Sequence, residues 1–513
     1  MTFQENAARA EDHVPLFEID EAVKARLRRI GVIDVGSNSI RLVVFDGMAR
    51  SPAYFFNEKV LCGLGAGLGE TGRLNPEGRR KALGALHRFV ALASRLHLSG
   101  MIAVATAAVR DAEDGPDFCA QVEAETGLQI HVASGAEEAR LSAKGVLLGW
   151  PDAEGIVCDM GGSSMELAIL RESRIHGCET SPLGPLKLAD FTDMEKRDKY
   201  IRKQVKALAK AVAAGEGEVL FLVGGSWRAV ARLDMLRRGY RLTVLHGYEP
   251  PVEELLETLA WIPNQDIAAL SDATGTSTAR LSLIPDVAPV LAEVIRRLAP
   301  RKVVISAYGL REGLLYRQMP ETMRERDPLI EAARHMEKHK SRIPGFGRVL
   351  FNWLKPLYAE ADAQELRLIE AACLMHDVHW RAHPEYRAEH CFASVTRANI
   401  GGVNHVDRVF IGFALLNRYK ASPPANIMES FGPMLGKERL AEAAQLGRAM
   451  RLGSMLSGSA HEVLESADLR VRDGVLSLTL RGVACECAGE AVERRLQGLA
   501  SRMGLPAELK LEP

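Results

Sequence analysis

The sequence lacks several features that would each assign it to a class of proteins at once. No segment reaches the ~18 consecutive apolar residues of a membrane-spanning helix, so a membrane protein is not expected. The eight cysteines include no C-x-x-C pair, which leaves no zinc or thioredoxin-type motif and predicts reduced thiols. An excess of one charge is also missing: 65 Lys and Arg face 66 Asp and Glu, a net charge of -1. This balance excludes a protein that binds nucleic acid through its overall charge.

What is present is typical of a folded protein with several domains. The 513 residues are 47% hydrophobic and 26% charged, and at roughly 100–200 residues per domain this length predicts about three domains. We interpret residues 1–24 as an acidic tail, because they carry six acidic and two basic residues. This segment lacks the basic and then apolar layout of a secretory signal, so we expect the protein in the cytoplasm.

Two stretches of the sequence resemble each other. Residues 30–45 and 156–170 each have the pattern of a strand, a polar turn and a second strand. In both, an Asp (Asp34 and Asp159) ends the first strand, and Gly and hydroxyl residues follow it. Internal similarity of this kind indicates a duplicated unit. We therefore predict an α/β fold with two similar lobes, residues 25–148 and 149–316.

The pattern changes beyond the second lobe. Helical periodicity dominates to about residue 420, which predicts an all-α domain over residues 317–425. Residues 469–480 then form a predicted β-hairpin on an Asp-Gly turn. With a helix and a short final strand expected after it, residues 426–513 are predicted to form a small α+β module.

The turns of the two similar stretches, residues 36–39 and 161–164, are candidate phosphate sites. Gly allows the backbone to approach an anion closely, and successive N–H groups of a tight turn point into one concavity. A third candidate contains Gly225 and Ser226, where a strand runs into a helix whose N-terminus would face the same cleft. A single turn of this type is also common in ordinary hairpins, whereas two facing copies favour phosphate binding.

Three carboxylates are candidates for chemistry. Asp159 and Glu166 lie on either side of the second turn and could converge on one Mg²⁺, although Glu166 could equally be a solvated strand residue. Ser134 and Glu137 fit a capping box. This leaves Glu138, which points elsewhere because neighbouring helix positions diverge by about 100°. Glu138 could orient or deprotonate water, and the alternative is an acid favoured by the helix dipole.

Five segments of this sequence, in order, resemble the signatures of the exopolyphosphatase/guanosine pentaphosphate phosphohydrolase family. They are residues 34–39, 105–112, 135–140, 159–166 and 307–313. The resemblance implies the two-lobed, duplicated, ribonuclease H-like fold of the actin/Hsp70/sugar-kinase superfamily. It implies Glu138 as the catalytic residue and a magnesium site at Asp159, Gly161 and Glu166. The implied phosphate contacts are Asp34, Gly36, Ser37, Asn38, Ser39, Arg110, Gly162, Ser163, Ser164, Gly225, Ser226 and Arg311.

The helical region resembles the HD-type domain of the longer family members through His376, Asp377 and His390. No convincing late Asp completes an HD metal site, so a structural or polyphosphate-binding relic is favoured over a second hydrolase. Residues 316–348 carry eight Lys and Arg against five Asp and Glu, and residues 394–420 carry four against one. These stretches could hold a long polyanion, and the alternative is that they are solvated helix faces.

The expected function is that of a magnesium-dependent exopolyphosphatase, which releases orthophosphate from inorganic polyphosphate with water activated by Glu138. One alternative is hydrolysis of guanosine pentaphosphate to the tetraphosphate. Another is a nucleotide-gated, actin- or Hsp70-like binding protein. Trp227 would either crowd a nucleoside or belong to the core. The family resemblance also implies a homodimer, and no membrane or nucleic-acid partner is expected.

Overall fold

The computed structural model describes residues 29–47, 49–420 and 422–512. The acidic tail proposed for residues 1–24 lies outside these residues. The chain forms two compact units. The first contains the described part of Met1–Gly239 together with Tyr248–Glu325, and the second contains Tyr240–Gly247 and Arg326–Pro513.

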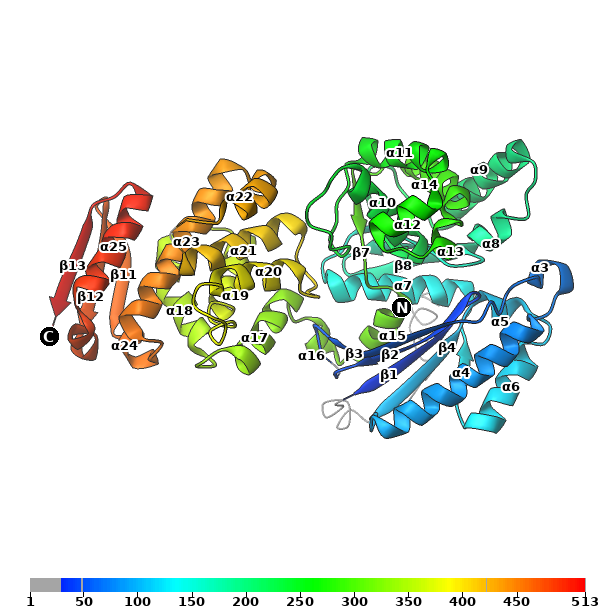
Figure 1. Cartoon of the computed structure of the whole chain (residues 1–513), viewed down its shortest axis with the longest axis horizontal. Helices are drawn as coiled ribbons and strands as arrows, with labels where there is room; N and C mark the ends of the chain where they lie inside the picture. The colour runs from blue at the N-terminus through cyan, green and yellow to red at the C-terminus, as the bar shows by residue number, and fades with distance from the viewer. Residues whose placement is uncertain (1–28, 48, 421, 513) are drawn as a thin grey trace, which may run out of the picture. The chain divides into compact units, whose positions relative to one another are not determined.

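The first lobe of the first unit is built on a sheet with the strand order β3-β2-β1-β4-β5 (Figure 1). The central strand β1 pairs antiparallel with β2 and parallel with β4. Its side chains are buried on both faces because helices cover both: Ile33 packs in the core with α4 and α6, and Val32 packs with α7 and α15. The strands are β1 (Ile30–Val35), β2 (Ser39–Phe45), β3 (Tyr54–Leu61), β4 (Gly100–Ala105) and β5 (Ile130–Val132).

The second lobe repeats this topology. Its sheet has the order β10-β9-β6-β7-β8. Read in reverse, this order matches that of the first sheet, with β6 in the place of β1 and β7, β8, β9 and β10 in the places of β2, β3, β4 and β5. The strand β6 likewise pairs antiparallel with β7 and parallel with β9. The predicted duplication and the actin-like, two-lobed α/β fold are therefore confirmed. The strands are β6 (Gly155–Met160), β7 (Met165–Arg171), β8 (Arg174–Ser181), β9 (Val219–Gly224) and β10 (Lys302–Ile305).

The helices of the first unit cover the two sheets. Two of them, α7 (Gly135–Gly149) and α15 (Leu310–Gln318), pack against each other. The Asn75 side chain accepts a hydrogen bond from the Gly78 N–H and so caps the N-terminus of α4. The others are α3 (Leu68–Thr71), α4 (Pro76–Arg95), α5 (Ala107–Asp111), α6 (Gly115–Thr126), α8 (Pro185–Leu188), α9 (Met194–Ala211), α10 (Gly225–Arg237), α11 (Val252–Trp261), α12 (Ile267–Thr274), α13 (Thr278–Leu281), α14 (Ile284–Leu298) and α16 (Glu321–Arg324).

The second unit has one continuous hydrophobic core, which runs from its helices into its small sheet. Its longest helices are α21 (His405–Tyr419) and α23 (Gly436–Ser457). The segment Tyr240–Gly247 contributes Leu242 to this core, and the Tyr240 hydroxyl lies 3.0 Å from the His405 Nδ1. The others are α17 (Pro328–Lys340), α18 (Phe346–Leu354), α19 (Ala363–Leu374), α20 (Arg387–Arg397), α22 (Ala425–Phe431), α24 (His461–Glu465) and α25 (Glu490–Met503).

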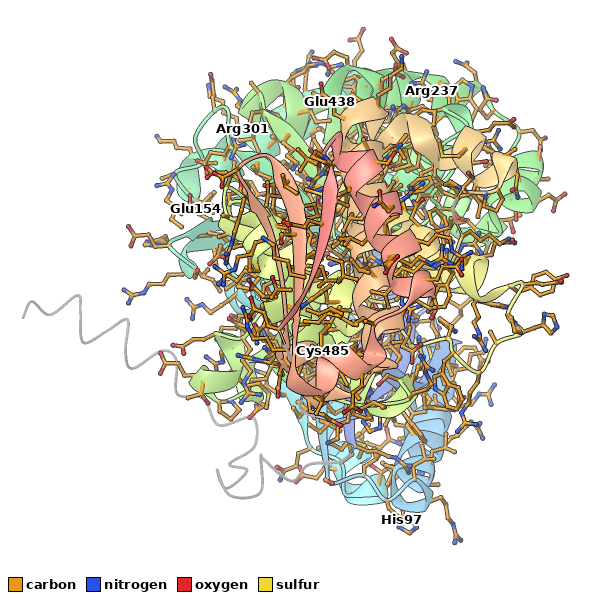
Figure 2. The ribbon with its side chains drawn as sticks, turned by 90° about the vertical axis from the view of Figure 1, so that its left-hand side faces the viewer. His97, Glu154, Arg237, Arg301, Glu438 and Cys485 are labelled. Carbon is orange, nitrogen blue, oxygen red and sulfur yellow. The ribbon has the colours of Figure 1, made fainter. Side chains whose placement is uncertain are left out.

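The C-terminal hairpin is confirmed. The strands β11 (Ala467–Arg472) and β12 (Val475–Arg481) join at Asp473 and Gly474, both with positive φ, as a two-residue hairpin turn favours. The expected helix and final strand follow as α25 and β13 (Ala507–Glu512), which pairs parallel with β12. Figure 2 faces this module, with Cys485 at one end of it. No described helix is long and apolar enough to cross a membrane.

Candidate active site

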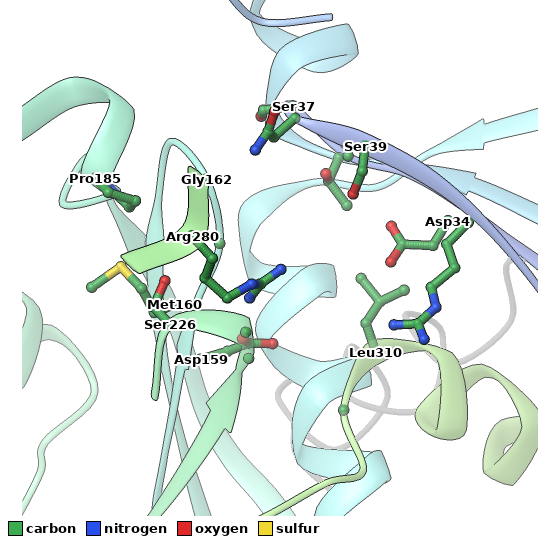
Figure 3. A pocket seen from close by; sticks show the side chains of 18 of the residues that line it. Asp34, Ser37, Ser39, Asp159, Met160, Gly162, Pro185, Ser226, Arg280 and Leu310 are labelled. Atoms are coloured by element: carbon green, nitrogen blue, oxygen red, sulfur yellow. The ribbon is translucent and has the colours of Figure 1, made fainter. Parts of the chain in front are cut away.

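A cleft between the two lobes of the first unit collects most of the predicted site residues (Figure 3). Three of the predicted residues, Arg110, Ser163 and Glu166, do not line it. The predicted residues that do are Asp34, Gly36, Ser37, Asn38, Ser39, Glu138, Asp159, Gly161, Gly162, Ser164, Gly225, Ser226 and Arg311. Residues from both halves of the duplicated fold therefore face one space.

The two predicted turns have the same geometry and contact each other. The Gly36 N–H donates to the Ser39 carbonyl at 3.1 Å, and the Gly161 N–H donates to the Ser164 carbonyl at 3.0 Å. The Ser163 hydroxyl donates to the Ser37 hydroxyl at 3.0 Å, so Ser163 joins the lobes even though it does not line the cleft. Their glycines leave the backbone accessible to an anion.

The third predicted element begins where β9 runs into α10. Gly224 has φ +102°, and a Cβ there would lie 2.5 Å from Asp159 Oδ1, so only glycine suits this position. Gly225 and Ser226 start α10 beside the Arg280 guanidinium, which Figure 3 shows extending into the cleft. Trp227 is 0% exposed. Of the two alternatives for Trp227, crowding a nucleoside or belonging to the core, the second is therefore correct.

Glu138 lies in the first turn of α7 and is buried. The Ser134 side chain accepts a hydrogen bond from the Glu137 N–H, as the capping box predicts. The other bond of a capping box, from the Ser134 N–H to the Glu137 carboxylate, is wrongly predicted. The Glu137 carboxylate instead contacts His131 at 2.8 Å and Arg317 at 3.3 Å. Glu138 accepts a hydrogen bond from Arg110 at 3.3 Å. Burial, and next the charge of Asp159, raise the pKa of Glu138 to about 8.

Asp159 and Glu166 are directly opposite each other on β6 and β7. Glu166 is 1% exposed, so its reading as a solvated strand residue is wrong. Its Oε1 accepts a hydrogen bond from the Thr180 hydroxyl at 2.9 Å, whereas its Oε2 has no partner among the described residues. The Ser142 hydroxyl donates to Asp159. Burial raises the pKa of both carboxyls, and the charge of Glu138 raises that of Glu166 further.

These carboxylates fit a magnesium ion of the kind that binds together with substrate. In the described chain no three His, Cys, Asp or Glu side chains are close enough to hold a metal alone. Mg²⁺ commonly uses only one or two carboxylates and completes its shell with water and substrate phosphates. After burial, the charges of the neighbouring carboxylates raise the pKa values of Glu138 and Glu166, and the Glu166 Oε2 has no partner among the described residues. A cation would offset this negative charge.

The two predicted phosphate-binding arginines differ in their surroundings. Arg311 lines the cleft and lies 4.0 Å from the Asp34 carboxylate. Arg110 contacts Glu138 and, at 3.0 Å, Asp111. Arg110 therefore orients Glu138 in this structure and does not line the cleft.

Sequence reasoning did not identify four cationic residues that line the cleft: Arg41, Lys59, Arg228 and Arg280. Arg41 could have been found, because side chains alternate along a strand and Arg41 lies two residues after Ser39. Arg228 follows the predicted Gly225 and Ser226, and burial, then the charge of Arg311, lower its pKa to about 10. Lys59 and Arg280 lie outside every recognised motif and carry no sequence signal.

The HD-like residues of the second unit are engaged in other contacts. His376 is 1% exposed, and its Nδ1 lies 2.8 Å from the Cys373 carbonyl. Asp377 forms an ion pair with Arg342 at 2.6 Å. The ring centroids of His379 and His390 are 6.0 Å apart. A guanidinium thus already balances the Asp377 charge, which favours a structural role for this region.

The fold and the cleft together define a two-lobed α/β protein of the actin-like ATPase fold, with candidate phosphate-binding turns from both lobes in one cleft. The Ppx/GppA phosphatase family model matches residues 43–322, and the exopolyphosphatase C-terminal model matches residues 329–509. The chain belongs to the Ppx/GppA phosphatase family, as the five sequence motifs predict.

Named relatives come from both branches of this family. Exopolyphosphatase 1 of Mycobacterium bovis is 27% identical over 310 residues, covering 57% of this chain and 88% of the relative. The guanosine-5'-triphosphate,3'-diphosphate pyrophosphatase of Aeromonas salmonicida is 24% identical over 501 residues, covering 93% of this chain and 98% of the relative. The crystal structure of an exopolyphosphatase from Cytophaga hutchinsonii matches with a TM-score of 0.51 and 23% identity, over 56% of this chain and 96% of that one. This last similarity shows the fold alone.

Proposed function

We propose that the protein is a magnesium-dependent exopolyphosphatase that releases orthophosphate from the end of inorganic polyphosphate. The observation that carries this proposal is the charge arrangement of the cleft. Two carboxylates, the buried Glu138 and the half-buried Asp159, face a space that five cations also line: Arg41, Lys59, Arg228, Arg280 and Arg311. A substrate that is anionic along its whole length suits a cleft lined by these cations, because phosphoryl transfer depends mainly on positioning and charge stabilisation.

In the proposed reaction, the backbone N–H groups of the two turns and the Arg311 guanidinium hold the terminal phosphate. Glu138 accepts a proton from a water molecule as the water oxygen bonds to the terminal phosphorus. The bridging P–O bond breaks, and the shortened chain leaves with the bridging oxygen. Asp159, Glu166 and the Gly161 carbonyl would hold magnesium. When bound, magnesium would offset the phosphate charge and favour the ionised form of Glu138.

Hydrolysis of guanosine pentaphosphate is the second candidate function, with the same residues in the same roles. It is supported by the Aeromonas relative, which matches over 93% of this chain. A nucleotide-gated binding protein of the actin-like fold is the candidate from a different class. A cytoplasmic homodimer remains the expectation from the sequence and the family resemblance.

Initial rates of phosphate release test these candidates directly. Long polyphosphate, tripolyphosphate and guanosine pentaphosphate are compared at equal phosphate-end concentration, with magnesium and with a chelator. We expect the highest kcat/KM with polyphosphate and no release in the chelator. A higher kcat/KM with guanosine pentaphosphate would support the second candidate, and the absence of release from all three substrates would support the binding protein.

A further inference from the structure

One helix of the first unit concentrates positive charge. The helix α9 contains seven Lys and Arg against two Asp and Glu, in a chain whose net charge is -1. Two of the seven cations pair with acidic neighbours, Lys196 with Asp193 at 3.6 Å and Arg197 with Asp286 at 3.0 Å. Among the described residues the other five form no ion pair. They are Lys199, Arg202, Lys203, Lys206 and Lys210.

These five cations share one face of α9, which we call the basic stripe. An α-helix turns by about 100° per residue, so the five positions fall within an arc of about 100°. All five are exposed, whereas Ile201, Val205 and Leu208 on the opposite face are buried. Like charges three or four positions apart, such as Lys199 and Lys203, destabilise a helix. An anionic partner would relieve this repulsion.

An apolar groove adjoins the basic stripe. The helices α9 and α11 both pack against α14, and residues of all three line a groove of about 330 Å³ (Figure 1). Its apolar lining includes Ile201, Leu256 and Pro289, one from each helix. The groove shares no lining residue with the cleft of the candidate active site. It is therefore a separate candidate binding surface.

The rim of this groove connects it to the basic stripe. Arg202 belongs to the stripe and also lines the groove, and Arg296 lines it from α14. Two carboxylates of the lining already have cationic neighbours: Asp198 lies 3.7 Å from Arg197, and Glu293 lies 4.0 Å from Arg296. The charge that remains without a counterion is therefore positive, and it borders an apolar floor. A ligand that is both acidic and apolar suits this surface.

The chain itself contains a segment of this chemistry. Residues 11–21, the acidic segment, lie outside the described residues. Five Asp and Glu and no Lys or Arg give this segment a formal charge of -5. The helix α9, with seven cations and two anions, has a formal charge of +5. The apolar residues within the acidic segment are Val14, Leu16, Phe17 and Ile19.

We propose that the acidic segment of one copy of this chain docks on a second copy, where its apolar side chains enter the groove and its carboxylates face the basic stripe. The same chain is a poor source, because Ile19 lies only ten residues before Arg29, and ten extended residues span at most about 36 Å. Figure 1 shows the start of β1 and the helix α9 on opposite sides of the first unit. The inference does not depend on the proposed function.

Peptide binding tests the docking surface. A fluorescent peptide of residues 10–22 is titrated into the full-length protein, whose own segment carries Phe17→Ser/Ile19→Ser so that it does not fill the groove. Fluorescence anisotropy gives the Kd. We expect Lys203→Glu/Lys206→Glu to raise this Kd at least about ten-fold, because two attractive contacts become repulsive. A peptide of the same residues in scrambled order keeps the charge and should bind at least about ten-fold more weakly, because its apolar anchors no longer match the groove.

Two further variants serve as controls for this titration. Arg95→Glu/Lys437→Glu reverses two exposed cations outside α9 and should leave the Kd unchanged. Leu256→Ser changes the lining of the groove without changing its charge. It should weaken binding of the native peptide and leave that of the scrambled peptide as it was, a difference that general destabilisation would not produce.

A mixing experiment identifies the source of the segment. One full-length protein carries Phe17→Ser/Ile19→Ser and an intact stripe, and the other carries Lys203→Glu/Lys206→Glu, an intact segment and a heavy nitrogen label. A carbodiimide joins carboxylates to neighbouring lysines, and mass spectrometry identifies the linked peptides. In the equimolar mixture we expect links from labelled residues 11–21 to the unlabelled Lys199 or Lys210. The labelled protein alone should give none.

The outcomes either support or overturn the proposal. It is overturned if the peptide does not bind, if the stripe variant binds it as tightly as the Arg95→Glu/Lys437→Glu control does, or if the scrambled peptide binds equally well. Links confined to single copies in a mixture of labelled and unlabelled wild-type protein would overturn the second copy as the source. None of these results bears on phosphate release, so the proposed function stands or falls separately.

Discussion

Asp159 lies directly opposite Glu166 in the second lobe, at the positions that Asp34 and Arg41 occupy in the first. The duplicated hairpins thus place an acid against an acid in one lobe and an acid against a base in the other. Two facing carboxylates would attract a cation, whereas Arg41 would attract an anion. One repeated backbone therefore provides a candidate metal site and a candidate phosphate site, and Asp159 from the first and Arg41 from the second line the same cleft.

Replacing the proposed base should abolish most turnover. We expect Glu138→Gln to lower kcat by about 10²–10⁴-fold, because the amide is nearly isosteric but accepts no proton. Tripolyphosphate binding should persist. Glu137→Gln is the matched control, since Glu137 is next in sequence but contacts His131 and Arg317. Steady-state rates check both variants, and a Glu138→Gln variant with kcat within a few-fold of wild type would exclude Glu138 as the base.

Removing a proposed metal ligand should change the magnesium requirement. Asp159→Asn and Glu166→Gln are each expected to raise the half-activating magnesium concentration at least about ten-fold, since each loses a charged oxygen ligand or its support. Asp34→Asn should act instead on the KM for substrate. Glu179→Gln on β8 changes an exposed carboxylate of the same sheet and serves as the control. Unchanged magnesium titrations for both metal-site variants would contradict the assignment.

Local patterns predicted the strands, the two turns and the helix caps well, because these features depend on neighbouring residues. The apolar and β-branched runs on either side of the polar turn in residues 30–45 were enough to predict β1 and β2. Local patterns do not predict contacts between segments that are far apart in the sequence. Arg41 and Lys59 lie opposite each other because of the register of β2 with β3, and Arg280 lines the cleft from the second lobe. Likewise, Arg317 competes for Glu137 from a helix far along the chain, so the capping box is only half formed.

Acid should destabilise the second unit through its buried histidines. Burial, and next the charge of Arg408, lower the pKa of His405 to about 4 from its ordinary value of 6.5. The neutral ring is therefore the folded form, while the unfolded chain takes up a proton below pH 6.5. Its contribution to stability is complete above that pH and is lost as the pH falls towards about 4, with a slope of at most ~1.4 kcal/mol per pH unit.

Thermal unfolding midpoints measured from about pH 7.5 to pH 5 check this expectation. His405→Gln should lower the midpoint at neutral pH, because the contact with the Tyr240 hydroxyl is weakened. It should also flatten the decline below pH 6.5. His383→Gln changes an exposed histidine of the same unit and should leave the pH slope as in wild type. Parallel slopes for all three proteins would show that His405 does not contribute.

The cations of the helical region divide into structural and exposed ones, which decides where a long polyanion could bind. In residues 394–420, Arg408 and Arg418 are buried, and Arg408 donates a hydrogen bond to the Ala398 carbonyl at 2.7 Å. These two cannot serve as a solvated track. Lys338 and Lys340, in the last turn of α17, are exposed. They are the better candidates for contacts with a polymer.

Replacing these two lysines should therefore reduce the salt dependence of long-chain binding. Each phosphate contact that is lost removes up to ~0.9 from the slope of log affinity against log salt, because fewer counterions are released. We expect Lys338→Gln/Lys340→Gln to lower this slope for long polyphosphate and to leave tripolyphosphate unaffected, since the cleft alone is expected to hold a chain of three phosphates. Lys437→Gln/Lys510→Gln removes two other exposed lysines of the same unit as the control. If both double variants keep the wild-type slope, the +3 charge of residues 316–348 belongs to solvated helix faces and not to a polymer track.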